Sequence, residues 1–114
     1  LICNENAQLD QLPFEVAKDF RCGTNSMINN YNLVGEISKW VEDYDITEHT
    51  FLFSAATLSN YLIYQLYKIA DTNQYIDIGS SLGYHLGLKG CYLRGYLNQY
   101  WNHGALSTER DIWN

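Results

Sequence analysis

Short apolar runs alternate along the chain with longer stretches in which apolar residues recur at helical spacing. Thr50–Phe53 and Tyr75–Ile78 are nearly all apolar, which is typical of strands buried on both faces of a parallel sheet. A stripe at steps of three and four residues lies between them and consists of Leu58, Leu62, Leu66 and Ile69. Such a stripe predicts an amphipathic helix. Strand, helix and strand within about 30 residues predict a right-handed βαβ crossover.

The amino-terminal half predicts one strand and one long helix. Leu1–Cys3 has the character of a strand end. From Met27 to Tyr44, apolar residues recur at steps of three and four, so we expect a helix there. A side-chain oxygen of Asn25 or Ser26 is expected to cap its first turn. Gly35 would weaken this helix by about 1 kcal/mol relative to Ala and would allow a close approach to a neighbouring element.

Residues 7–22 fit no single pattern. Their apolar members could line a short helical face, with Pro13 near its first turn, where proline is tolerated. These members are Phe14, Val16, Ala17 and Phe20. After Gly79 the pattern loosens, and we expect residues 105–114 to form a polar surface tail.

Composition narrows the class of protein. The 114 residues fit one α/β domain spanning 1–114, and a hydrophobic fraction of 46% supplies a core. The net charge of −6 offers no basic face, so nucleic acid is not expected as a partner.

Three cysteines without a CxxC pair predict reduced thiols and a cytoplasmic location. The three histidines are scattered, so no metal site is expected from them, and no apolar run reaches the roughly 18 residues of a membrane span.

The first candidate loop follows the first of the two apolar runs. Ligands of open parallel sheets bind at the carboxyl ends of the strands. The loop Ser54, Ala55, Ala56 and Thr57 consists of small residues, which let backbone amides approach an anion at the amino end of a helix. A strand-to-helix turn capped by Ser54 or Thr57 explains the same residues.

The second candidate loop follows the second apolar run. Asp77 lies among apolar residues, and a buried carboxylate needs hydrogen-bond partners. It is therefore a candidate to bind ribose hydroxyls, although amides of the next loop would satisfy it equally. Gly79 permits a tight turn, and Ser80 and Ser81 can donate hydrogen bonds to a phosphate.

Isolated polar and aromatic residues offer further candidates. Arg94 can bind a diphosphate bidentately, stack on Tyr92 or Tyr96, or pair with an acidic side chain. Glu5 follows the first strand and is either a strand-end carboxylate with a role or a solvated side chain. The aromatic cluster of Tyr96, Tyr100 and Trp101 could stack on a base or sugar, or could belong to a core or interface.

Two segments carry a resemblance to a known family. Phe51–Ala56 and Tyr75–Ser80, the latter with Ile-Asp-Ile-Gly, resemble the carboxyl-terminal half of bacterial and viral GT-D-type glycosyltransferases over roughly residues 50–96. The resemblance implies a Rossmann-like parallel sheet with flanking helices, in a small or incomplete domain. It also implies that Asp77 and the loop 54–57 face a nucleotide-sugar donor, and that the acceptor is a glycan or a lipid-linked molecule.

The chain departs from this family in its acidic motif. The family's metal-binding Asp-x-Glu has no counterpart, and the nearest spacing, Asp43-Tyr44-Asp45, falls at the end of the expected helix. The resemblance implies a divalent cation, Mn or Mg, but assigns no ligands for it and no catalytic residue. Because the numbering opens at Leu1, we expect that an amino-terminal portion of the protein lies outside this chain.

Two other functions remain open at this point. Asp77–Gly83 resembles the first glycine motif of S-adenosylmethionine-dependent methyltransferases, with Ser81 in place of the middle glycine. A non-enzymatic assembly module, such as a homo-oligomer, would instead use the Tyr- and Trp-rich end to pack on a partner. Both enzyme interpretations require two neighbouring parallel strands whose tips, near Ala55 and Gly79, open onto a common crevice.

Overall fold

A computed structural model describes residues 1–88. The chain divides into two compact units. The first unit joins Leu1–Glu5 to Glu15–Gly79, and the second joins Asn6–Phe14 to the residues from Ser80 onward. Arg94, the cluster of Tyr96, Tyr100 and Trp101, and the expected tail 105–114 lie outside the described residues.

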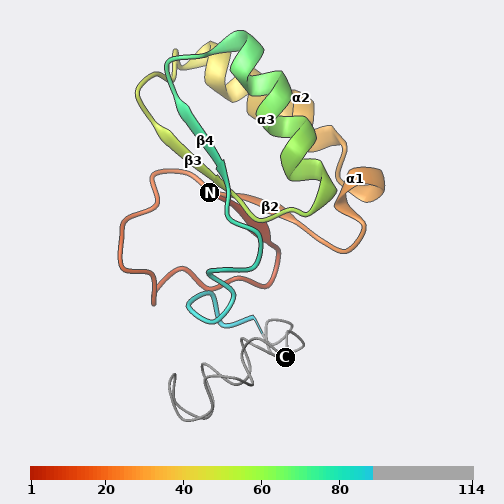
Figure 1. Cartoon of the computed structure of the whole chain (residues 1–114), viewed down its shortest axis with the longest axis vertical. Helices are drawn as coiled ribbons and strands as arrows, with labels where there is room; N and C mark the ends of the chain where they lie inside the picture. The colour runs from red at the N-terminus through yellow and green to blue at the C-terminus, as the bar shows by residue number, and fades with distance from the viewer. Residues whose placement is uncertain (89–114) are drawn as a thin grey trace, which may run out of the picture. The chain divides into compact units, whose positions relative to one another are not determined.

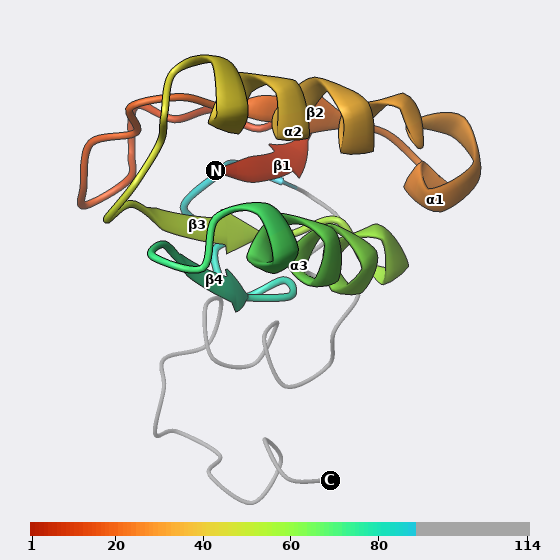
Figure 2. The ribbon, with the colours of Figure 1, turned by 90° about the horizontal axis from the view of Figure 1, so that it is seen from above.

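The first unit is built on a four-stranded, all-parallel sheet. Its strands are β1 (Ile2–Asn4), β2 (Phe20–Cys22), β3 (Thr50–Phe53) and β4 (Gln74–Asp77), in the order β2-β1-β3-β4. Figure 2 shows this order, with the carboxyl ends of the strands toward the short helix α1 (Ser26–Asn29). The parallel α/β architecture expected from the sequence is therefore confirmed for the described part of the chain.

The predicted strand-helix-strand unit is present. The helix α3 (Thr57–Ile69) connects β3 to β4, which pair in parallel with Phe53 opposite Asp77. Three of the four stripe residues, Leu58, Leu62 and Leu66, are fully buried. Ile69 is 43% exposed, because it is the last residue of the helix, and the prediction that it belongs to the buried stripe is wrong.

The single helix predicted from Met27 to Tyr44 is broken into two. α1 ends at Asn29, and α2 spans Asn32–Asp43. The break follows from Asn30, whose side-chain oxygen accepts a hydrogen bond from the Gly23 N–H at 3.0 Å and so ties the chain back to the end of β2. The close approach expected at Gly35 is also wrong, since a Cβ there would meet no atom within 4 Å.

Residues 5–19 contain neither helix nor strand, so the short helical face considered for residues 7–22 is not formed. Phe20 instead begins β2, and its backbone N–H donates to the Leu1 carbonyl at 2.9 Å. The reason is pairing with a distant strand, which the local spacing of apolar residues does not encode. Phe14 is 41% exposed.

The helices α2 and α3 pack side by side on one side of the sheet, as Figure 1 shows. Their buried residues meet the strand residues Ile2, Cys22, Phe51 and Phe53 in one core. Trp40 of α2 closes the edge of this core by packing edge-to-face against Phe20 at 5.7 Å and Phe51 at 6.1 Å between ring centroids. No helix within residues 1–88 is long and apolar enough to cross a membrane.

Candidate functional site

A pocket of about 560 Å³ lies in the first unit, at the carboxyl ends of three neighbouring strands. Asn4 comes from the end of β1, Cys22–Ile28 from the end of β2 and the start of α1, and Ser54–Thr57 from the loop between β3 and α3. All three strands are parallel, so their ends meet at the same edge of the sheet. The first candidate loop, Ser54–Thr57, therefore lines a pocket.

The loop Ser54–Thr57 is not capped as the sequence predicts. The residue at the N-cap of α3 is Ala56, and no side chain caps the helix. The Ser54 hydroxyl donates instead to the Gly79 carbonyl at 2.6 Å. Ala56 has φ 49° and ψ −129°, a conformation that residues other than glycine rarely adopt. This strained turn directs the chain from β3 into α3 at the wall of the pocket.

Two buried serines hold this loop in place. The Ser26 hydroxyl donates to the Ala55 carbonyl at 3.0 Å, and the Ala55 N–H donates to the Ser59 hydroxyl oxygen at 2.9 Å. Ser26 and Ser59 are 5% and 0% exposed. The expectation that Asn25 or Ser26 caps this helix is wrong, since the N-cap residue Asn25 is left-handed and no side chain caps the helix. The structural role of Ser59 could have been recognised from the sequence, because Ser59 is a polar residue on the apolar face of a predicted helix.

The pocket is uncharged and carries hydrogen-bonding side chains. None of the described residues that line it is Asp, Glu, Lys or Arg. Thr24, Asn25 and Thr57 line it and are exposed. The amino end of α3, with its positive end of the helix dipole, opens onto the same space. The arrangement suits a ligand that combines an anionic group with several hydrogen-bonding groups.

Asp77 and Gly79 lie next to the first loop but not in the pocket wall. The Ile78 N–H donates to the Phe53 carbonyl at 2.9 Å, and the bond from Ser54 to Gly79 joins the two strand tips. The premise that Asp77 is buried is wrong: it is exposed, and its carboxylate accepts a hydrogen bond from the Gly79 N–H at 2.9 Å. The Asp77 carboxylate thus binds an amide of its own turn. This is the structural alternative to ribose binding that the sequence left open for Asp77.

Ser80 and Ser81 belong to the second unit. Within that unit the Gly83 N–H donates to the Ser80 carbonyl at 3.0 Å, and the Gln8 N–H donates to the Leu86 carbonyl at 2.9 Å. The segment 80–87 is a series of turns. Neither serine is among the residues that line the pocket of the first unit.

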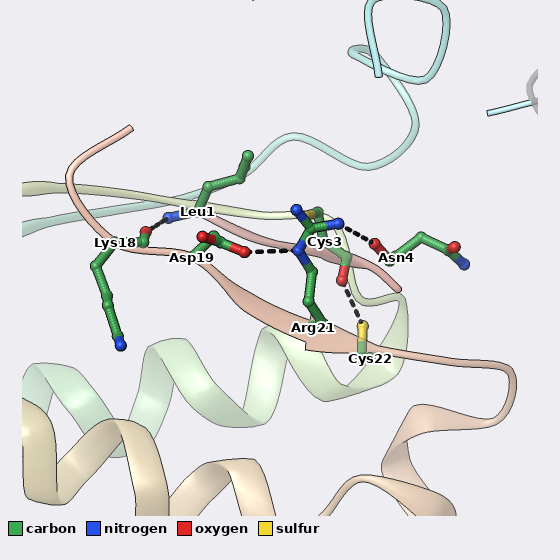
Figure 3. Close-up of polar contacts among 7 residues, drawn as sticks. All are labelled: Leu1, Cys3, Asn4, Lys18, Asp19, Arg21 and Cys22. Atoms are coloured by element: carbon green, nitrogen blue, oxygen red, sulfur yellow. Dashed lines mark hydrogen bonds and ion pairs between the residues drawn. The ribbon is translucent and has the colours of Figure 1, made fainter. Parts of the chain in front are cut away.

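Arg21 takes part in the polar contacts between β1 and β2, as Figure 3 shows. Arg21 forms an ion pair with Asp19 at 2.6 Å and donates to the Asn4 carbonyl at 3.3 Å. It is therefore held along the strand pair rather than directed into the pocket. The Cys22 thiol donates to the Cys3 carbonyl at 3.4 Å. Burial raises the pKa of both the Cys3 and the Cys22 thiols, and both cysteines are free.

Within residues 1–88, no group of three or more His, Cys, Asp or Glu side chains is placed to hold a metal ion. The described residues that line the pocket include no His, Asp or Glu. Comparisons of the chain with protein-family models, curated proteins and solved structures found no match.

Proposed function

We propose that the pocket at the ends of β1, β2 and β3 binds a nucleotide-sugar donor, and that the chain is the donor-binding part of a Rossmann-like glycosyltransferase. In this reaction the acceptor hydroxyl oxygen bonds to the anomeric carbon while the bond from that carbon to the diphosphate breaks. The hydroxyl proton is lost and a nucleoside diphosphate leaves. Stabilising the charge of that leaving group is the main demand on the protein.

The position of the pocket carries the proposal. In the order β2-β1-β3-β4, the chain moves from β1 to one neighbour and later returns to the other, so the direction of winding changes at β1. Open parallel sheets bind their ligands outside the carboxyl ends of the strands at such a switch point. The pocket is lined by the end of β1 and by the ends of both its neighbours.

The chemistry of the wall fits the diphosphate end of such a donor. Ala56 and Thr57 are exposed and line the pocket at the amino end of a 13-residue helix, where the dipole favours an anion. The volume of about 560 Å³ lies within the range of about 300–1,000 Å³ for small-molecule sites. A divalent cation, which the family resemblance implies, would when bound supply positive charge that neutralises part of the negative charge of the diphosphate.

Calorimetric titration of the whole chain tests the proposal. UDP, GDP, UDP-glucose and GDP-mannose are added in turn, each with and without manganese. We expect at least one nucleotide or nucleotide sugar to bind. Thr24→Tyr places a large ring in the pocket and should reduce that affinity at least tenfold. Thr72→Tyr is the matched control, because Thr72 is exposed and lies before β4, at the amino ends of the strands, and it should leave the affinity unchanged.

Two outcomes would remove the proposal when S-adenosylmethionine is added to the compounds titrated. Absence of binding by all four compounds, with and without manganese, contradicts it directly. Binding of S-adenosylmethionine with no nucleotide bound would support the methyltransferase interpretation. The methyltransferase motif begins at Asp77 on the edge strand β4, and neither Asp77 nor Gly79 lines the pocket. The nucleotide-sugar site implied by the family resemblance loses the same two residues but keeps the loop Ser54–Thr57, which does line the pocket.

A further inference from the structure

The outward face of α3 carries tyrosine rings and no carboxylate. The leucines of the apolar stripe face the core, so the opposite side of the helix faces away from the sheet. Tyr64 and Tyr67 lie on that side and are each 60% exposed. The other exposed residues of α3 are Thr57, Asn60, Lys68 and Ile69. None of the 13 residues of α3 is Asp or Glu, although the whole chain has a net charge of −6.

Four residues of α3 form a row that starts at the pocket. They are Thr57, Tyr61, Tyr64 and Lys68, at steps of four, three and four. Side chains at such steps stand in one line along a helix, here termed the tyrosine row. Thr57 lines the pocket, and Lys68 lies about 16 Å further along the helix axis, at about 1.5 Å per residue. The tyrosine row therefore runs from the pocket along the outside of α3.

Tyr31, the residue before α2, adds a further ring beside the tyrosine row. Its hydroxyl donates to the Tyr61 hydroxyl oxygen at 2.9 Å, and the two ring centroids are 5.5 Å apart. Tyr31 is 47% exposed and stands three residues after Ile28, which is 80% exposed and lines the pocket. Figure 1 shows α1 beside the amino end of α3. The aromatic surface thus begins at two walls of the pocket, one on each side of the Tyr31–Tyr61 pair.

Contacts within the protein hold these exposed rings in position. The Lys68 ammonium nitrogen lies 4.5 Å from the centroid of the Tyr64 ring. The hydrogen bond between Tyr31 and Tyr61 fixes the other two rings relative to each other. A side chain that is already held loses less rotamer freedom when a ligand packs on it. The surface is therefore prepared for stacking on a ligand.

The chemistry of the tyrosine row matches that of a neutral sugar chain. A tyrosine ring is apolar on its faces and polar at its hydroxyl, and a pyranose likewise has C–H groups on its faces and hydroxyls around its edge. Thr57 and Asn60 add exposed hydrogen-bonding groups. A membrane surface is usually bound through several cations and large aliphatic anchors, whereas the tyrosine row has one lysine and no aliphatic residue.

We propose that the tyrosine row, together with Tyr31, is a saccharide-binding surface that holds a sugar chain as the acceptor, with the end of that chain at the pocket. The inference rests on the proposed function and names the class of its acceptor. An acceptor hydroxyl has to reach the anomeric carbon of the donor, so the surface that holds the acceptor has to be continuous with the donor pocket. Thr57 and Ile28, which line the pocket, supply that continuity.

The test measures binding of sugar chains to the whole chain by calorimetry, with maltohexaose, cellohexaose and chitohexaose as probes. Tyr64→Ala removes the central ring of the tyrosine row, and Tyr64→Phe keeps the ring but removes its hydroxyl. Tyr44→Ala is the matched control, because Tyr44 is an equally accessible tyrosine, 71% exposed, that follows α2 and lies outside the row. UDP, GDP and their sugars are titrated into the same samples, and thermal melting confirms that each variant is folded.

We expect at least one of the three oligosaccharides to bind the wild type. Tyr64→Ala should weaken that binding at least fivefold, because the stacked ring is lost. Tyr64→Phe should stay within about twofold of the wild type, since the ring face is retained. Tyr44→Ala should match the wild type. Nucleotide and nucleotide-sugar affinities should be equal in all four proteins, because Tyr64 is not among the residues that line the pocket.

The inference is overturned if none of the oligosaccharides binds the wild type, or if Tyr64→Ala and Tyr44→Ala weaken binding equally. Light scattering and vesicle sedimentation identify two other occupants. Loss of a dimer in Tyr64→Ala would assign the surface to a second copy of the chain. Loss of binding to phosphatidylglycerol vesicles in Tyr64→Ala, with no oligosaccharide bound, would assign it to a membrane.

The nucleotide titrations separate this inference from the proposed function. If the wild type binds a nucleotide but no oligosaccharide, the inference fails and the proposed donor site stands. If it binds an oligosaccharide that Tyr64→Ala releases, but no nucleotide or nucleotide sugar, the saccharide surface stands and the donor site fails. If it binds neither class of compound, both fail.

Discussion

Ala56 adopts a backbone conformation that its side chain disfavours. Its φ of 49° and ψ of −129° lie in a region that glycine enters freely and alanine does not. Such residues cost about 1–3 kcal/mol and persist where the surroundings fix the turn. Here the fixed neighbour is Ala55, held on both sides by the buried hydroxyls of Ser26 and Ser59.

Ala56→Gly should therefore raise the free energy of unfolding by about 1 kcal/mol. Release of the strain exceeds the roughly 0.4–1 kcal/mol that the extra freedom of glycine costs through the unfolded chain. Urea denaturation followed by tryptophan fluorescence measures the change. Ala70→Gly is the control: Ala70 follows the last residue of α3 with a negative φ of −152°, so the same replacement there should lower stability. A loss of stability in Ala56→Gly would contradict the strained turn.

At the scale of elements, the sequence predicted the helices and strands that show a recognisable apolar pattern within their own residues. The sequence predicted β3, α3 and β4, because two short apolar runs flank a stripe of apolar residues at steps of three and four. The break between α1 and α2 was missed, because the apolar spacing runs through Asn30 without interruption while its side chain bonds to Gly23, seven residues earlier. β2 was missed because three residues are too few for a period, and its place depends on pairing with β1.

Gly35 of α2 allows helix propensity to be tested without a change in side-chain packing. A Cβ there would meet no atom within 4 Å, so Gly35→Ala adds helix propensity without a clash. We expect the free energy of unfolding to rise by about 0.5–1 kcal/mol, as measured by urea denaturation.

The same substitution at Gly79 serves as the control for Gly35→Ala. Gly79 also has open space around its Cα, but its φ is +55°. Gly79→Ala should therefore lower stability by about 1 kcal/mol, because alanine is strained in the left-handed region. Equal effects at both glycines would contradict the account, since the backbone conformation is what distinguishes them.

At the scale of the molecule, the pocket could be predicted only in part. The loop 54–57 was recognised because it joins two elements that the sequence made visible. Asn4 and the segment Cys22–Ile28, which complete the wall, were not assigned to a site. Residues 4, 22 and 54 become neighbours only through the strand order β2-β1-β3, and strand order is set by the packing of the whole sheet rather than by any local pattern.

The two ends of the sheet differ in what their polar groups do. At the carboxyl ends, exposed polar side chains such as Thr24 and Thr57 line the pocket. At the amino ends, Asn73 is 6% exposed and all its bonds are internal. Its side-chain oxygen accepts from the His49 N–H at 2.8 Å, and its amide nitrogen donates to the Ile46 carbonyl at 2.9 Å and to the Tyr75 hydroxyl at 3.1 Å.

This division predicts that stability and ligand binding can be changed separately. Asn73→Ala leaves the His49 N–H and the Ile46 carbonyl without their partner, and should lower the free energy of unfolding by about 2 kcal/mol. Because Asn73 lies at the end of the strands opposite the pocket, nucleotide affinity measured by calorimetry below the melting transition should stay within about twofold of the wild type. Thr24→Tyr should do the reverse, losing affinity while its denaturation midpoint stays nearly constant. Loss of affinity in folded Asn73→Ala would show that the two ends are coupled and that the amino ends take part in the site.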